Sequence, residues 1–247
     1  LDLEGRLLWQ RNLAVEHPRS GNDVGMGASP TIIDGTVVVQ IDCQGDPFAA
    51  GIDMASGADR WTTARDRIAS WSSPLAVTLP PHGDCVLLQN PNGLDLRKAS
   101  DGAVVWHRKG PCEGIPMTTE TGGMLLVPGD GLSAVPVASA AGDKPAWANP
   151  KLACGIASPL AWSDGPHGGG VACINRAGVL GIGRLADGTL VGQVRLAGSF
   201  WGSPILVGDT IVASNKEGST FLVSNAADGE PPRILGTNEL PGVFTAT

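Results

Sequence analysis

The hydrophobic and β-branched residues of this chain fall into short runs that end at turn-forming residues. Between Ser29 and Arg65, four such runs follow one another, at positions 30–33, 36–41, 48–54 and 59–63. Asp34-Gly35, a dipeptide typical of tight hairpins, separates the first two runs, and the third ends at Ser56-Gly57. Short runs bounded in this way predict four antiparallel strands joined by tight turns.

Two markers repeat this arrangement along the chain. The first is a proline that usually follows serine, and successive copies are 42 to 45 residues apart, at Pro30, Pro74, Pro116, Pro159 and Pro204. The second is a turn glycine followed four or five residues later by tryptophan, in the pairs Gly5…Trp9, Gly57…Trp61, Gly102…Trp106 and Gly142…Trp147. Four strands in about 40–45 residues are typical of one blade of a β-propeller.

The repeat therefore predicts an all-β fold, in which residues 1–247 form part of a β-propeller with four-stranded blades. Five complete blades are expected at 28–65, 72–109, 114–150, 157–196 and 202–240, with partial blades at 1–13 and 242–247. We expect a fragment of a seven- or eight-bladed ring. The alternative is a six-bladed ring in which the partial blades combine, but that combined blade would lack its second strand.

One tryptophan recurs on the outer strand of a blade, where its ring can lie between that blade and the next. This position is expected to make four residues structural wedges, namely Trp9, Trp61, Trp106 and Trp147. Burial of such a large aromatic side chain contributes roughly 3–5 kcal/mol, judged by the cost of truncating it.

Composition narrows the possible functions. The 35 glycines and 19 prolines are incompatible with long helices, and 42% hydrophobic residues are enough for a sizeable core. The net charge is -7 and no basic cluster is present, which argues against a nucleic-acid partner. No apolar run reaches about 18 residues, so a membrane-spanning segment is not expected.

The cysteines and histidines show no metal-ligand spacing, so no metal site is predicted. The five scattered cysteines are interpreted mainly as small buried hydrophobic residues. A pairing of Cys112 with Cys154 is the alternative, because both precede equivalent prolines in successive repeats. The sequence leaves this pairing open.

The segment from Gly51 to Trp61, Gly-Ile-Asp-Met-Ala-Ser-Gly-Ala-Asp-Arg-Trp, resembles the repeat of pyrroloquinoline-quinone (PQQ)-like β-propellers. The resemblance extends over nearly the whole chain. It implies the propeller fold, which is shared by quinoprotein alcohol dehydrogenases and by non-enzymatic exported propellers such as the lipoprotein of the outer-membrane assembly machinery. The WD-repeat alternative is disfavoured, because its Gly-His and Trp-Asp landmarks are missing.

Candidate ligand-binding residues lie in the segments that lead into the blades, because such loops surround one mouth of a propeller channel. Trp71 and Trp201 each lie three residues before a repeat proline, outside the wedge register. They can form an aromatic platform for a ligand or a hot spot for a protein; the alternative is that they fill the channel. The long loop 14–27 adds His17, Arg19 and Met26 as candidates.

The sequence favours a non-catalytic binding or scaffold propeller that holds a protein, peptide or carbohydrate, with no cofactor and no catalytic residue. The resemblance suggests an extracytoplasmic location. The first alternative is a fragment of a PQQ-dependent dehydrogenase. The resemblance implies that such an enzyme needs a calcium site and usually a vicinal disulfide, and no Cys-Cys pair is present. The second alternative is a sensor domain fused to a signalling protein.

Overall fold

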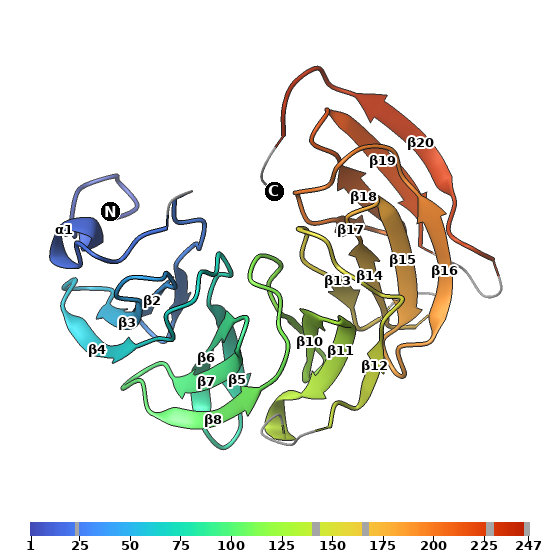
Figure 1. Ribbon diagram of the computed structural model, residues 1–247. Coiled ribbons are helices and arrows are strands. Elements are labelled where there is room, and N and C mark those ends of the chain that lie inside the picture. Colours follow the sequence, from blue (N-terminus) through green and yellow to red (C-terminus); the bar gives the residue numbers. More distant parts are fainter. Residues whose placement is uncertain (23–24, 140–143, 165–167, 226–229, 245–247) are drawn as a thin grey trace. The chain divides into compact units, whose positions relative to one another are not determined.

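The fold is all-β and contains five four-stranded antiparallel sheets (Figure 1), as the sequence predicts. The structure is a computed structural model that describes residues 1–22, 25–139, 144–164, 168–225 and 230–244. Each sheet is a blade-like meander, and together they are consistent with part of a β-propeller. The chain divides into two compact units, Leu1–Gly114 and Ile115–Thr247, and each is described by itself.

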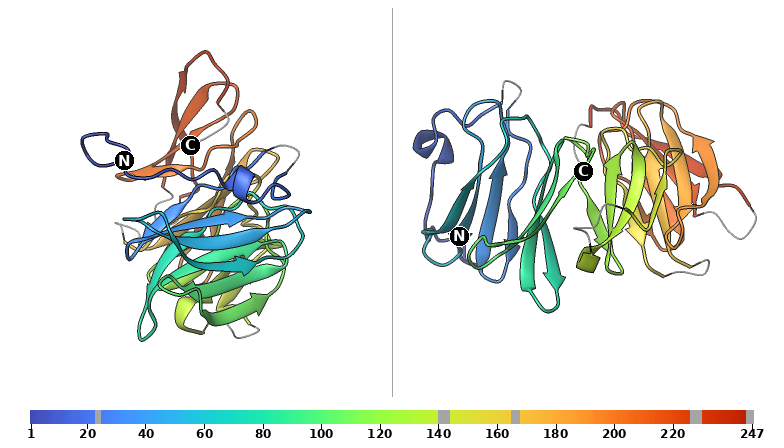
Figure 2. Two further views of the ribbon diagram at one scale, coloured as in Figure 1. Left: turned by 90° about the vertical axis from the view of Figure 1, so that its left-hand side faces the viewer. Right: turned by 60° about the horizontal axis from the view of Figure 1, so that its bottom comes forward.

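The first unit contains two of these sheets, which lie face to face (Figure 2). A short helix, α1 (Leu13–Glu16), precedes them. The first sheet contains β1 (Thr31–Ile33), β2 (Thr36–Ile41), β3 (Phe48–Asp53) and β4 (Asp59–Ala64). The second contains β5 (Leu75–Leu79), β6 (Gly83–Asn90), β7 (Gly93–Lys98) and β8 (Val104–Lys109). The strands of the first sheet agree with the predicted runs to within one residue.

The second unit contains the other three sheets. The third sheet contains β9 (Thr119–Thr121), β10 (Met124–Gly129), β11 (Gly131–Pro136) and β12 (Trp147–Asn149), with a 3-10 helix, η1 (Val137–Ser139), after β11. The fourth contains β13 (Leu160–Trp162), β14 (Gly170–Ile174), β15 (Val179–Arg184) and β16 (Leu190–Arg195). The fifth contains β17 (Ile205–Val207), β18 (Thr210–Ser214), β19 (Ser219–Ser224) and β20 (Ile234–Glu239).

The tryptophans of the outer strands contact the glycine turn of the following sheet. Trp61, on β4, is 8% exposed, and its indole Nε1 donates a hydrogen bond of 2.8 Å to the carbonyl of Ala99. The same hydrogen bond, from the indole Nε1 to a backbone carbonyl, joins Trp9 to Met54 and Trp147 to Leu185, both at 2.8 Å. For Trp106, which is 8% exposed, the corresponding turn at Gly142 lies outside the described residues.

Glycine is required at these turns for two reasons. Gly102 has a φ of 71°, a conformation that side chains rarely adopt. A Cβ at this position would also lie 2.7 Å from the ring of Trp61, which is closer than any real contact. The regular spacing of glycine and tryptophan in the sequence is therefore explained by a contact between successive sheets.

The fourth sheet departs from this pattern because Gly192 stands where the first three sheets have tryptophan. A Cβ on Gly192 would lie 2.5 Å from Cδ of Pro232, which precedes β20 of the fifth sheet. Proline from the neighbouring sheet thus occupies the space that an indole fills elsewhere. The interface stays packed although its tryptophan is missing.

The serines of the repeat connect successive sheets through their hydroxyl groups. In the first unit, the Ser73 hydroxyl accepts a hydrogen bond of 2.8 Å from the backbone N–H of Ser29. In the second unit, the Ser203 hydroxyl accepts one of 3.0 Å from the N–H of Ser158. Proline fixes the backbone just after each serine, so the pair satisfies a backbone donor that lies outside the sheets.

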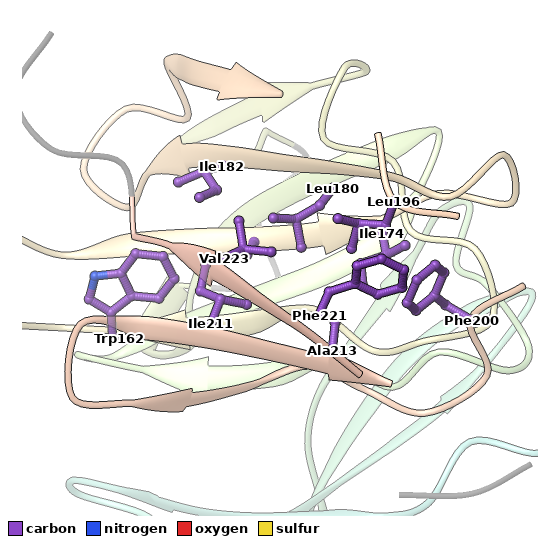
Figure 3. Close-up of a cluster of buried hydrophobic side chains, with 11 residues drawn as sticks. Trp162, Ile174, Leu180, Ile182, Leu196, Phe200, Ile211, Ala213, Phe221 and Val223 are labelled. Atoms are coloured by element: carbon purple, nitrogen blue, oxygen red, sulfur yellow. The ribbon is translucent and has the colours of Figure 1, made fainter. Parts of the chain in front are cut away.

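The core of the second unit illustrates the packing between sheets. A cluster of buried side chains extends from the fourth sheet to the fifth and includes Trp162, Ile174, Leu180, Phe200, Ile211 and Phe221 (Figure 3). Neither sheet alone buries these residues, because a single meander has two faces and no interior.

Replacing Trp61 with alanine is expected to lower the free energy of unfolding by about 3–5 kcal/mol, because a cavity opens between two sheets and the Ala99 carbonyl loses its partner. The matched control is Trp201→Ala, since Trp201 is 41% exposed. Its cost is expected to stay below about 2 kcal/mol. Denaturant unfolding of both variants is the measurement, and equal losses would contradict the prediction.

Candidate functional site

The topology of each sheet brings the loops between blades to one edge. In the first sheet, β2 and β4 are parallel to each other, because both are antiparallel to β3. The residues that follow these two strands, Asp42 and Arg65, therefore lie at the same edge, together with the chain that enters β1. We call this edge of the first unit, formed by residues 13–22, 25–30, 42–47, 65–74 and 90–93, the loop face.

The segment before β1 is held against the loop face by many hydrogen bonds. The Asn12 side chain accepts from the N–H of Val15 at the start of α1. The Asn22 side chain donates to the carbonyl of Asp42 at 2.8 Å, and the N–H of Asp46 donates to the carbonyl of Arg19 at 2.9 Å. These contacts fix the described part of the loop on the β2–β3 connection.

Two of the predicted ligand residues in this loop have partners on β3 or in the β2–β3 connection. The ring of His17 stacks on Phe48, with the ring centroids 3.8 Å apart. The guanidinium of Arg19 pairs with Asp46 at 2.5 Å and its side chain remains 78% exposed. The carboxylate beside His17, that of Glu16, is paired with Arg11, which lowers the pKa of Glu16.

Met26 and Trp71 lie together on the loop face. The indole Nε1 of Trp71 donates to the carbonyl of Gly25 at 3.0 Å, and a Cβ on Gly27 would lie 3.3 Å from its ring. Met26, between these two glycines, is 51% exposed, and Trp71 is half-buried. Met26 is thus an exposed apolar residue between two glycines that contact the Trp71 indole, on an otherwise polar edge.

Trp201 belongs to the second unit, in the segment before β17. It is 41% exposed, and Nζ of Lys216 lies 4.7 Å from the centroid of its ring. The ammonium group thus covers one face of the indole in a cation–π contact. That Trp71 and Trp201 face one mouth of a channel stays a prediction.

A buried cluster of charges at the loop face was not predicted from the sequence. Arg65 binds Asp42 through two hydrogen bonds of 3.0 and 3.1 Å. Nη1 of Arg65 also lies 3.8 Å from Oδ2 of Asp95 on β7. The same carboxylate oxygen accepts a hydrogen bond of 2.8 Å from Nε of Arg97. The side chains of Arg65 and Asp42 are 6% and 0% exposed. The cluster therefore connects the first sheet to the second through desolvated charges.

Comparison of the repeats could have revealed this cluster. The end of the second strand is marked by Asp42 in the first sheet but by asparagine in three others, at Asn90, the last residue of β6, and at Asn175 and Asn215, which follow β14 and β18. Asp95 lies on β7 one residue before the residue at which the β-bulge begins. The residue at the equivalent position of β3 in the first sheet is Ala50. A charged residue at a repeat position that is elsewhere apolar or neutral breaks the usual preference for burying apolar side chains. Such exceptions concentrate at functional sites.

A pocket of about 260 Å³ opens beside the cluster, between the first and second sheets. Its polar lining comes from Arg65, Asp66, Asn90, Asp95, Arg97 and His107. Asp95 and His107 are cross-strand partners on β7 and β8. Both charge signs line the walls, so the pocket suits a small polar group rather than a bare anion.

The environment shifts the pKa values of two carboxyl groups here. Burial raises the pKa of Asp42, while hydrogen bonds from Arg65 and Gln40 oppose that rise. Hydrogen bonding by Asn92, at 2.9 Å, lowers the pKa of Asp66. The carboxylates at this edge are thus held by guanidinium or amide groups of the same unit. Among the described residues, no group of three or more His, Cys, Asp or Glu side chains could hold a metal ion.

Comparison with known proteins supports the fold. No protein-family model and no curated protein sequence matches this chain. The crystal structure of BamB from Moraxella catarrhalis, an outer-membrane assembly lipoprotein, superposes with a TM-score of 0.67 and 16% identity. The match covers 90% of this chain and 63% of BamB.

A computationally designed protein, Ika8, gives a similar result, with a TM-score of 0.64 and 9% identity over 89% of this chain and 64% of the designed one. The chain thus spans less than two thirds of either structure. At these identities the likeness concerns the fold alone.

Replacing Arg65 with methionine is expected to destabilise the protein by about 3–5 kcal/mol at neutral pH, because Asp42 stays buried without its partner. The pKa of Asp42 should then rise further above its unfolded value of about 3.9. A folded state with the higher pKa binds the proton more tightly, so stability is lost as pH rises through that pKa. The deficit should therefore shrink as the pH is lowered.

Arg67→Met is the matched control, because Arg67 is 72% exposed and pairs with the partly exposed Asp46. It is expected to cost less than about 1 kcal/mol. Denaturant titrations between about pH 4 and pH 8 measure both differences. An Arg65→Met deficit that does not change with pH would show that Asp42 is not the affected group.

Proposed function

We propose that this chain is part of a non-catalytic β-propeller that binds a protein or peptide partner through its loop face. The observation that carries the proposal is the contrast between paired charges and an unpaired apolar surface at this edge. Asp42, Asp46 and Asp95 are each bound by arginine, whereas Met26 lies exposed beside Trp71.

Protein recognition suits this surface better than carbohydrate recognition. Aromatic residues and methionine are enriched where protein interfaces bury their central contacts. Sugar rings stack on open aromatic faces, but the ring of Trp71 packs against Gly27 on the loop face. In the second unit, Lys216 likewise covers one face of Trp201. Hydrogen bonds to the described part of the loop, at Arg19 and Asn22, also favour binding, since less conformational freedom is lost.

An extracytoplasmic location belongs to the same proposal. It is supported by the likeness to BamB, an outer-membrane lipoprotein, and by the PQQ-like repeat of the sequence. No described helix is long and apolar enough to cross a bilayer. The alternatives, a quinoprotein fragment and a sensor domain of a signalling protein, share the fold and differ in what the loop face would hold.

A photoreactive amino acid at position 26 tests the binding surface in cells that produce the protein. It is expected to give a discrete cross-linked species with a partner protein, and Trp71→Ala should weaken the isolated interaction by about tenfold or more. The control position is Val104, which is 56% exposed on β8. Equal labelling from both positions, or none from position 26, would contradict the proposal.

Titration calorimetry with PQQ and calcium separates the quinoprotein alternative. We expect no saturable heat, because the carboxylates of the loop face are held by arginines and amides. Saturable binding in the micromolar range would instead favour the enzyme fragment.

A further inference from the structure

Two cysteines of the second unit lie close together. The sulfur atoms of Cys154 and Cys173 are 3.1 Å apart, and both thiols are free. Cys173, on β14, is 1% exposed, whereas Cys154 is partly exposed in the segment that connects β12 to β13. A disulfide has a sulfur–sulfur bond of about 2.05 Å, so a shift of about 1 Å would bring the two sulfurs to bonding distance.

The backbone fixes this approach. The N–H of Gly155 donates a hydrogen bond of 2.8 Å to the carbonyl of Ile174, next to Cys173. A Cβ on Gly155 would lie 2.9 Å from the backbone nitrogen of Arg176, so only glycine lets the two segments come this close. The proximity of the thiols thus follows from main-chain contacts on both sides.

The pair lies at the edge of a buried cluster between the third and fourth sheets. Cys173 packs in that cluster with Leu126, Trp147 and Leu152, and Cys154 contacts it from the connecting segment. The pair is therefore placed where a covalent bond would hold the connection between two sheets onto β14.

We propose that Cys154 and Cys173 form a disulfide in the presence of an oxidising thiol–disulfide couple. With oxidised glutathione as the oxidant, the thiolate of the more exposed Cys154 attacks one glutathione sulfur and releases one molecule of reduced glutathione. The sulfur of Cys173 then attacks the mixed disulfide at Cys154 and releases the second. Two S–H bonds of the protein are lost, one S–S bond forms, and two electrons and two protons pass to glutathione.

The order of the two steps follows from the surroundings of each sulfur. The hydrogen bond with Cys154 and complete burial raise the pKa of Cys173 well above its usual value. The raised pKa disfavours the Cys173 thiolate and burial shields its sulfur, so Cys154 reacts with glutathione first. Cys173 then attacks the neighbouring mixed disulfide as its proton passes to the departing glutathione thiolate. Cys43, Cys85 and Cys112 supply no such neighbour in the hydrogen-bond pattern of the described residues.

Peptide mapping of the whole chain tests the proposal directly. Trypsin releases residues 152–176 as one peptide, because no lysine or arginine lies between Leu152 and Arg176. After incubation with oxidised glutathione, this peptide is expected to be lighter by two hydrogens and to resist alkylation until it is reduced. The other cysteines lie on different peptides and should be alkylated once the chain is unfolded. A peptide 152–176 that is alkylated at both cysteines would overturn the proposal.

Thermal unfolding provides the second readout. Reduction is expected to lower the Tm of the oxidised protein by about 5–10 °C, because the bond closes a loop of about twenty residues. Cys154→Ser should remove this response to reductant, whereas the control Cys85→Ala, which changes a buried cysteine of the first unit, should keep it. A Tm of the wild-type protein that does not depend on reductant would also overturn the proposal, whether or not the variants fold.

Discussion

A four-stranded meander has two faces and no interior, so each sheet of this chain depends on contact with its neighbours. The indole of Trp61 shows how the contact is made. Its ring covers Gly102 of the next sheet, and its N–H satisfies the carbonyl of Ala99. Apolar burial and hydrogen bonding thus act at one point, and the positive φ of the glycine gives the ring its room. Where the tryptophan is missing, Pro232 fills the space beside Gly192.

Against this regular packing, the charged cluster between the first two sheets is an exception. Burying Arg65 and Asp42 costs solvation free energy that their mutual hydrogen bonds only partly offset. The first sheet has Ala50 and Ile52 at the positions that Asp95 and Arg97 occupy in the second, so the repeat itself does not require charges there. The cluster fixes the geometry of the loop face, because it joins the end of β4 to the β2–β3 connection and to β7.

The loop face and the cysteine pair lie in different surroundings. Around Met26 and Trp71, the backbone is held by hydrogen bonds while the apolar side chains stay available, which suits recognition of another protein. Cys154 and Cys173 lie in the other unit, within packed surroundings. A disulfide there would stabilise the fold without altering the loop face. Disulfide formation and partner binding are therefore independent of each other.

The sequence by itself determined the fold class, because turn glycines, prolines and short β-branched runs act locally and recur with one period. The ligand-binding roles of Trp71, Trp201, Met26, His17 and Arg19 stay predictions. The tertiary structure alone decided three features: the pairing of Arg65 with Asp42, the filling of the space beside Gly192, and the contact of Cys154 with Cys173. Each joins segments separated in the chain, and which side chains meet there depends on how a sheet or connecting segment lies against its neighbours. No local pattern of turns and strands encodes that placement.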